Sequence, residues 1–134
     1  MRLLLALLFI LLCPLAQATS LEAATKTAHD YIAAYNAAEL ADKRALLSDS
    51  FSPDGRFVSS GQDLDFAGVL AMTEQFHQGY RMEIEGPVRA HNGYVSFRWR
   101  YQRLDGSESW SGIDFCELDE QGRFRTVVVF FDDE

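Results

Sequence analysis

The sequence predicts an α+β fold in which three helices pack on the concave side of a curved antiparallel sheet. Three observations support this prediction. Apolar residues recur at helical spacing in the first half of the chain, and the period changes to two near residue 80. Three turn signals then divide the second half into four strands. Helices followed by a run of strands are typical of this class.

Residues 1–18 are expected to be a signal peptide that precedes the folded domain. Arg2 gives a basic start, residues 3–12 form an unbroken apolar run, and Ala16 and Ala18 provide the small residues that a signal peptidase requires. The apolar run is too short to cross a membrane, which takes about 20 residues. We therefore expect an exported protein, periplasmic or secreted, with one mature domain of residues 19–134. An uncleaved anchor is the alternative.

Charge and cysteine content narrow the kinds of partner. The formal net charge is −8, and it becomes −9 when the single charge of Arg2 leaves with the signal peptide. A strongly negative chain is not expected to bind nucleic acid or, after cleavage, an anionic membrane. Cys116 would be the one cysteine of the mature chain, so the core must stabilise the fold without an internal disulfide.

The first helix is predicted over residues 21–37. Its apolar stripe includes Tyr31 and Tyr35, one turn apart on the same face. Thr19 and Glu22 match a capping box at its start. A helical tyrosine pair has two interpretations here: core residues with hydroxyl groups at a rim, or side chains that face a ligand.

Two shorter helices are predicted next. The second covers residues 40–47, with Arg44 laying its aliphatic stem along the surface. The third runs from Asp65, which can cap it, to His77. His77 is a candidate for the mouth of a pocket, although a histidine at a helix C-terminus also complements the helix dipole.

The remaining segments are predicted as loop and strands. Residues 48–62 are expected to be loop with one short strand at 56–59. Apolar and polar residues alternate over 80–89, where Gly86-Pro87 indicates a bulge or an edge strand. Asn92-Gly93 is a strong hairpin signal. The four strands after residue 80 are expected to form an antiparallel meander.

The turn at Asp105-Gly106 fixes the register of the two strands beside it. A two-residue loop places Phe97 opposite Asp114 and Trp99 opposite Gly112. The same register pairs Tyr101 with Trp110 and Val95 with Cys116. Opposed residues share a face, and the apolar face must contact the helices. The sequence therefore predicts that the carboxyl group of Asp114 points into the core side of the sheet.

A carboxyl group among apolar neighbours is desolvated, which raises its pKa, and it requires a hydrogen-bond donor. Three roles stay open for Asp114. It can be a structural acid held by a core hydroxyl, a pocket residue that orients a ligand, or a catalytic group. Trp99 and Trp110 on the same face are expected to be wall residues suited to flat apolar ligands.

No metal site or cofactor is expected. His29, His77 and His91 lie on separate predicted elements and lack metal-ligand spacing. The sequence also contains no glycine-rich phosphate loop and no nucleophile elbow. Arg98 and Arg100 belong to the outer face of the sheet, which is either solvated or the interface of a homodimer.

The segment Ile113-Asp114-Phe115, followed by residues 118–124 (LDEQGRF), resembles the last hairpin of the NTF2-like superfamily. This superfamily includes the SnoaL-like proteins, the polyketide cyclases and the ketosteroid isomerases. The order of elements over residues 20–132 is similar too. The resemblance implies a cone-shaped domain, in which a strongly curved sheet wraps the first helix and leaves a pocket.

In the isomerases of this superfamily, the hairpin acid and a tyrosine of the first helix form an oxyanion site, and a second acid is the base. The resemblance therefore implies Asp114 and Tyr31 as catalytic candidates. Gly55 stands near the expected position of the base, which leaves Asp54 or His77 for that role. The resemblance also implies that the last strand completes the pocket wall with Val127, Val129 and Phe131. The alternative is that Thr126 and Val128 point inward instead.

The function expected from these features is a cofactor-free, exported domain that binds a small, largely apolar molecule in its cone. Asp114 and Tyr31 would anchor the ligand. Further ligand-binding candidates are Tyr35, Phe97, Trp99, Trp110, Val127, Val129 and Phe131. Two alternatives stay open: an isomerase or cyclase that stabilises an enolate, and a non-catalytic interaction module whose core is filled by its own side chains.

Overall fold

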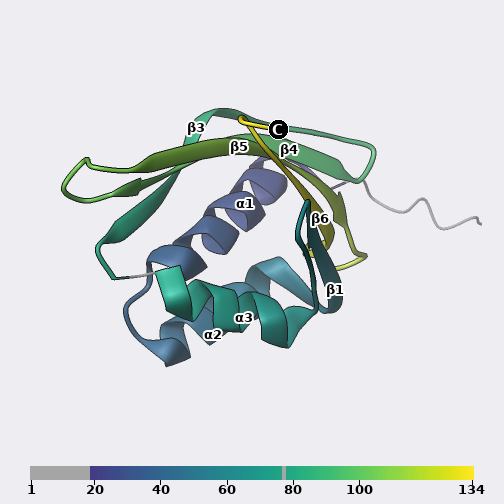
Figure 1. Ribbon diagram of the computed structural model, residues 1–134. Coiled ribbons are helices and arrows are strands. Elements are labelled where there is room, and N and C mark those ends of the chain that lie inside the picture. Colours follow the sequence, from purple (N-terminus) through teal and green to yellow (C-terminus); the bar gives the residue numbers. More distant parts are fainter. Residues whose placement is uncertain (1–18, 77) are drawn as a thin grey trace, which may run out of the picture.

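The computed structural model describes residues 19–76 and 78–134, so the predicted signal peptide and His77 lie outside the described residues. Three helices and a six-stranded curved sheet confirm the α+β class. Figure 1 shows the sheet arching over α1, with α2 and α3 on the same concave side. The elements are α1 (Leu21–Asn36), α2 (Leu40–Ser50), β1 (Phe51–Ser59), β2 (Gln62–Leu64), α3 (Phe66–Phe76), β3 (Tyr80–His91), β4 (Tyr94–Arg103), β5 (Ser109–Leu118) and β6 (Phe124–Phe131).

The strand order is β2-β1-β6-β5-β4-β3. Strands β3 to β6 form the predicted antiparallel meander. The sheet is larger than predicted because β1 pairs in parallel with β6 and β2 pairs with β1. The short strand expected at 56–59 is therefore the end of β1, and the loop expected over the rest of residues 48–62 is wrong, because α2 extends to Ser50 and β1 begins at Phe51. Pro53-Asp54-Gly55 does not end the strand, since a register shift between Phe51 and Arg56 absorbs the irregularity.

The turn chemistry of the meander agrees with the sequence. Asn92 and Gly93 both have positive φ, at 50° and 82°, as the tight β3–β4 hairpin requires. The pairing of β3 with β4 shifts between Glu85 and Arg89, which confirms the bulge expected at Gly86-Pro87. Strand β3 is also an edge strand of the sheet. None of the described helices has the length and apolar composition needed to span a membrane.

Helix α1 is the centre of the core. Its N-cap is Ser20 and not the expected Thr19, because Ser20 directly precedes the first helical residue and its Oγ accepts from the amide of Ala23 at 3.1 Å. Thr27 donates to the carbonyl of Gly122 at 2.9 Å and so ties α1 to the β5–β6 turn. The packed face of α1 brings Tyr31 into the core with no exposed surface.

The exposed edge of β3 is closed by a side chain from the end of α1. The side-chain Nδ2 of Asn36 donates to the carbonyl of Met82 at 2.8 Å. The side-chain Oδ1 of Asn36 accepts from the backbone N–H of Met82, also at 2.8 Å. Asn36 therefore supplies the two hydrogen bonds that a further strand would provide. This pairing satisfies the backbone of Met82, which is 8% exposed, and blocks the edge at that point.

We expect Asn36→Ala to lower the free energy of unfolding by about 2 kcal/mol, because it leaves a buried backbone donor and acceptor without partners. Urea denaturation measures the change. Gln75→Ala is the matched control, since it removes an exposed amide from α3 and should change stability by less than about 0.5 kcal/mol. Equal stability of both variants would show that the Asn36–Met82 pairing does not stabilise the fold.

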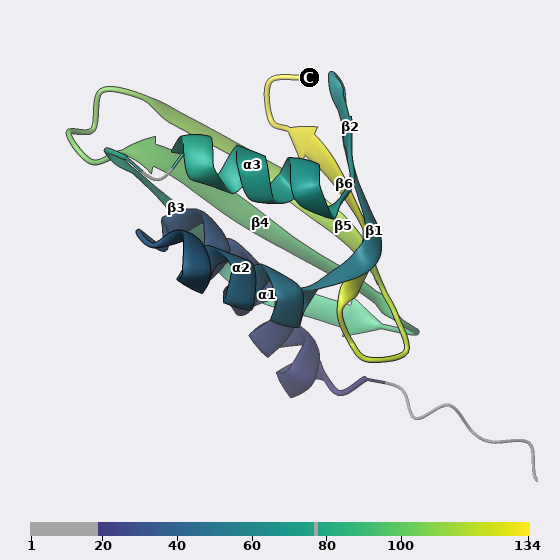
Figure 2. The ribbon, with the colours of Figure 1, turned by 90° about the horizontal axis from the view of Figure 1, so that it is seen from below.

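A buried lysine joins the three helices, which lie together on the concave side in Figure 2. Lys43 of α2 is 1% exposed, and its ammonium donates to the carbonyls of Ala34 at 3.0 Å and Tyr35 at 3.2 Å in α1 and of Thr73 at 2.9 Å in α3. These carbonyls belong to the last turns of two helices, which lack intrahelical donors. Lys43, and not Arg44, therefore fixes the position of α2, because Lys43 is buried whereas Arg44 is exposed.

Candidate functional site

The β4–β5 register agrees with the prediction at every pair that was named. Phe97 lies opposite Asp114, Trp99 opposite Gly112, Tyr101 opposite Trp110 and Val95 opposite Cys116. The predicted two-residue loop is wrong, because the N–H of Arg103 donates to the carbonyl of Glu108 at 2.9 Å and residues 104–107 form a four-residue loop. The register is the same for both loop lengths. Asp114 is 2% exposed, so its carboxyl group lies on the concave side of the sheet as predicted.

A cavity of about 250 Å³ lies between α3, the end of α1 and the concave face of the sheet. Its inner part is formed by buried residues: Tyr35, Phe57, Met82, Trp99, Tyr101, Asp114 and Val129. The remaining lining residues are more accessible and mark the mouth: Gln62, Met72, Phe76, Trp110 and Phe131. The walls are therefore almost entirely apolar, and Asp114 is the one carboxyl group among the lining residues that the structure describes.

The two oxygens of the Asp114 carboxyl group differ in their partners among the described residues. The indole Nε1 of Trp99 donates to Oδ1 at 2.7 Å. No described residue forms a hydrogen bond with Oδ2, although the side chain is almost fully buried. Burial raises the pKa of Asp114 to about 7, and the Trp99 hydrogen bond opposes this rise because it stabilises the ionised form. Both charge states of the carboxyl group are therefore populated near neutral pH.

Gly112 explains how the Trp99 indole reaches this position. The two residues are paired across β4 and β5, and a Cβ at position 112 would lie 2.7 Å from Cζ2 of Trp99 and 2.5 Å from the carbonyl oxygen of Phe130. Only a residue without a side chain leaves room for the ring to lie over the strand. Trp99 was expected to be a wall residue, and its role as the donor to Asp114 was not foreseen.

The two tyrosines of α1 occupy different depths. Their hydroxyl groups are 3.0 Å apart, and either can donate to the other. Tyr35 lines the cavity, whereas Tyr31 lies behind it and contacts the rings of Phe51 and Phe124. Burial raises the pKa of both hydroxyl groups above the ordinary value, so both stay protonated. Tyr35 is therefore better placed than Tyr31 to meet a ligand.

The other predicted wall residues divide into two groups. Trp99, Trp110, Val129 and Phe131 line the cavity as expected. Phe97 and Val127 do not line it, because they point into the core deeper along the sheet. The ring of Phe97 stacks on Phe124 with centroids 6.1 Å apart. The inward face of β6 thus carries Val127 and Val129, and the alternative with Thr126 and Val128 does not apply.

The structure does not bring Asp54 to the cavity. Asp54 is exposed on β1 and accepts a hydrogen bond from Ser52 at 2.5 Å, which lowers its pKa. The neighbouring Gly55 is buried, and a Cβ there would lie 2.7 Å from the ring of Phe51. An acid at position 55 would therefore have no space without a shift of the core. The second candidate base, His77, lies outside the described residues.

An aromatic stack at the mouth was not predicted. The rings of Tyr80 and Tyr101 are parallel within 7° at 4.8 Å, and Trp110 stacks on Tyr101 at 5.7 Å. The Tyr101 hydroxyl donates to the carbonyl of Phe76 at 2.9 Å, so the stack is tied to the end of α3. The sequence signal for this stack was the alternation on β3. Tyr80 and Met82 share a face, and Met82 pairs with Tyr101, so Tyr80 and Tyr101 lie on the same side of the sheet.

Groups that could hold a metal ion are not found among the described residues. The described lining of the cavity contains no lysine, arginine or histidine. The described lining therefore offers aromatic faces, one titrating carboxyl group and the tyrosines Tyr35 and Tyr101, but no side chain that would neutralise an anionic ligand.

We expect Trp99→Phe to raise the pKa of Asp114 above 7, because the substitution removes the hydrogen bond that stabilises the carboxylate. A ¹³C NMR titration of the side-chain carboxyl group measures the shift. Phe131→Leu removes another ring in contact with Trp99 but no donor to Asp114, so it is the matched control. An unchanged or lower pKa in Trp99→Phe would contradict the assigned role of the indole.

The comparisons with known proteins show the fold. No protein-family model matches the sequence, and a sequence comparison with curated proteins gives no match. A candidate isomerase of the SnoaL-like family from Agrobacterium tumefaciens is 29% identical and has a TM-score of 0.74, with 83% of this chain and 98% of that chain covered. An NTF2-like protein of unknown function from an Exiguobacterium species is 22% identical, with a TM-score of 0.62 and coverage of 81% and 99%.

A candidate ketosteroid isomerase from Kribbella flavida is 16% identical and has a TM-score of 0.67, with coverage of 84% of this chain and 80% of that chain. These similarities confirm that the chain has an NTF2-like α+β cone fold. The fold by itself does not assign a reaction, since one fold carries many functions.

Proposed function

We propose that this protein is an exported NTF2-like domain that binds a small, largely apolar molecule in the cavity of its cone, with Asp114 as the polar anchor. The observation that carries the proposal is a buried acid in an otherwise apolar cavity whose Oδ2 has no hydrogen-bond partner among the described residues. A ligand group that donates to this oxygen would give it a partner inside the cavity, where a charge-assisted hydrogen bond is stronger than in water. Apolar pockets with a few polar groups are typical of small-molecule sites.

Native mass spectrometry tests this proposal, with protein purified from the periplasmic or extracellular fraction of the cells that naturally produce it. We expect a bound small molecule that is released on unfolding. Val129→Trp should abolish its retention, because residue 129 lines the cavity. Val128→Trp is the matched control, since Val128 is next to Val129 in β6 but lies on the opposite face of the sheet. Equal retention by both variants would place the ligand elsewhere on the protein.

An isomerase or cyclase reaction is the second candidate. The observation in its favour is a buried carboxyl group whose pKa of about 7 suits proton transfer at neutral pH. Abstraction of a proton beside a carbonyl also needs a base separate from the acid that stabilises the enolate. Asp54 lies outside the cavity, so the described residues support binding better than this reaction. Turnover of an enolisable ketone that is lost in Asp114→Asn would reverse this preference.

Export is proposed from the sequence of residues 1–18, with cleavage after Ala18. Amino-terminal sequencing of the protein from the periplasmic or extracellular fraction should begin at Thr19. A chain that starts at Met1 in that fraction would indicate an uncleaved anchor instead.

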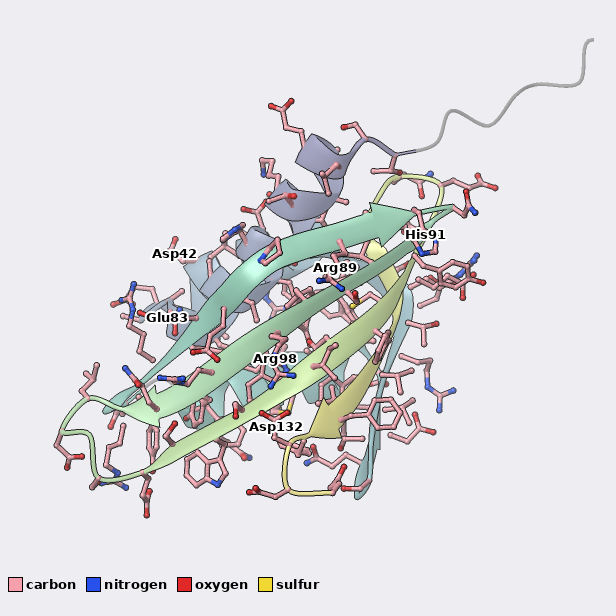
Figure 3. The ribbon with its side chains drawn as sticks, turned by 90° about the horizontal axis from the view of Figure 1, so that it is seen from above. Asp42, Glu83, Arg89, His91, Arg98 and Asp132 are labelled. Carbon is pink, nitrogen blue, oxygen red and sulfur yellow. The ribbon has the colours of Figure 1, made fainter. Side chains whose placement is uncertain are left out.

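We also propose that the outer face of the sheet pairs with a second copy. Phe115 and Phe130 are 49% and 50% exposed there, with edge-to-face rings 6.0 Å apart. Figure 3 shows Arg98 and Asp132 on this face, where they form an ion pair at 2.6 Å. Sedimentation equilibrium should show a dimer that Phe130→Glu dissociates, and a monomeric parent protein would refute the pairing.

A further inference from the structure

The composition of the cavity wall indicates the charge of the ligand. Seven of the twelve described lining residues are aromatic, and Asp114 supplies the one acid. Basic side chains are missing from this described lining, so an anionic ligand would be buried without a counter-charge. The formal charge of the whole chain is −8, which repels anions and attracts cations over longer distances.

We propose that the cavity binds an organic cation: a protonated amine with an apolar or aromatic body, whose ammonium group pairs with Oδ2 of Asp114. This inference rests on the proposed binding function and names the ligand class of the same site. Aromatic faces attract cations through their quadrupoles, and the attraction is larger when the cation is desolvated. A carboxylate surrounded by aromatic rings therefore provides both charge pairing and a favourable wall.

The arrangement along the cavity sets the orientation of the amine. Asp114 and Trp99 are 2% and 3% exposed and lie at the inner end, whereas Trp110 and Phe131 are 41% and 37% exposed at the mouth. The ammonium group would enter first and the body would lie towards Trp110. Because the Trp99 indole holds Oδ1 at 2.7 Å, the remaining oxygen has a fixed position for an incoming N–H donor.

The charge of Asp114 should decide the affinity. The titratable groups that interact with it are Tyr31 and Tyr35 from α1 and Cys116 from β5. Burial raises the pKa of all three, so they stay neutral where Asp114 titrates. Trp99 and the described lining residues of the other elements carry no charge. An amine must therefore bind to the carboxylate form, and its affinity should fall by about tenfold for each pH unit below 7.

Calorimetric titration with two matched probes tests the inference: 2-(1-naphthyl)ethylamine and its neutral isostere 2-(1-naphthyl)ethanol. At pH 8 we expect the amine to bind about tenfold or more tightly than the alcohol. In Asp114→Asn this preference should disappear while the alcohol still binds, because the amide keeps an acceptor for Trp99 but carries no charge. Glu83→Gln removes an equal charge from the outer face (Figure 3) and should keep the full preference.

The outcomes separate the ligand class from the binding function. Equal binding of both probes at pH 8, or an amine affinity that does not change between pH 8 and pH 6, would overturn the inference and leave the proposed function intact. Binding of neither probe would contradict both. If Asp114→Asn fails to fold, the pH profile of the parent protein decides, since it needs no variant. Trp110→Leu should weaken both probes to the same extent, because the naphthyl body that they share would lie against Trp110 at the mouth.

Discussion

Asp114→Asn is expected to stabilise the protein by about 4 kcal/mol at pH 8 and to leave its stability nearly unchanged at pH 4. Burial places the pKa of Asp114 in the folded state near 7, above its ordinary value of 3.8. The folded state therefore holds the proton more tightly than the unfolded chain. The stabilising contribution of the neutral acid is complete below pH 3.8 and is lost as the pH rises to 7, at about 1.4 kcal/mol per unit.

The difference between the parent protein and the variant isolates this contribution, because the other carboxyl groups titrate in both. Urea denaturation from pH 4 to pH 8 measures it, and the difference should grow steadily up to pH 7 and then level off. Glu83→Gln is the control, since its exposed carboxylate should give a difference within about 0.5 kcal/mol throughout. A flat difference for Asp114→Asn would mean that the acid is not desolvated in the folded state.

Lys43→Met is expected to destabilise the fold by about 3 kcal/mol. Methionine has a similar length and fills the space, but it cannot donate to the three buried carbonyls of Ala34, Tyr35 and Thr73. The ammonium also lies at the C-terminal ends of α1 and α3, where a positive charge is favourable. Because Tyr35, Met72 and Phe76 of these helices line the cavity, the variant should bind ligand less tightly as well.

The neighbouring Arg44→Met provides the matched control. Arg44 is exposed on the same helix, and arginine and methionine have similar helix propensities, so we expect a change below about 0.5 kcal/mol. Thermal and urea denaturation of the two variants side by side measure the contrast. If Lys43→Met were as stable as Arg44→Met, the desolvation of the ammonium would cost as much as its three hydrogen bonds contribute.

The register around Asp114 was predictable because it depends on local information. The Asp105-Gly106 turn determines which residues face one another, and alternation along the strand determines their side. The same reasoning placed Trp99 opposite Gly112. A glycine beside a tryptophan could have indicated that the indole lies across the strand towards Asp114. The donor to the buried acid was thus foreseeable in principle, although the sequence pattern led us to expect Trp99 as a wall residue.

Lys43 and β1 could not be predicted from local patterns. Helix α2 has no clear apolar stripe, and the burial of Lys43 depends on where the ends of two other helices meet. Strand β1 pairs in parallel with β6, so its partner lies about half the chain away, and Pro53-Asp54-Gly55 resembles a turn. Tyr35 lines the cavity and Tyr31 lies behind it because of the position of α1 along the sheet. The helical spacing of the two residues does not predict that position.

Ligand binding as proposed depends on one buried carboxyl group that faces an apolar cavity with an oxygen unpaired among the described residues. A ¹³C NMR titration of the Asp114 side chain, with and without the naphthylethylamine probe, measures this group directly. We predict a pKa near 7 in the free protein, which falls by at least one unit when the amine binds. A pKa close to 3.8 in the free protein would contradict the proposed site, because it would show that water or another donor already solvates the acid.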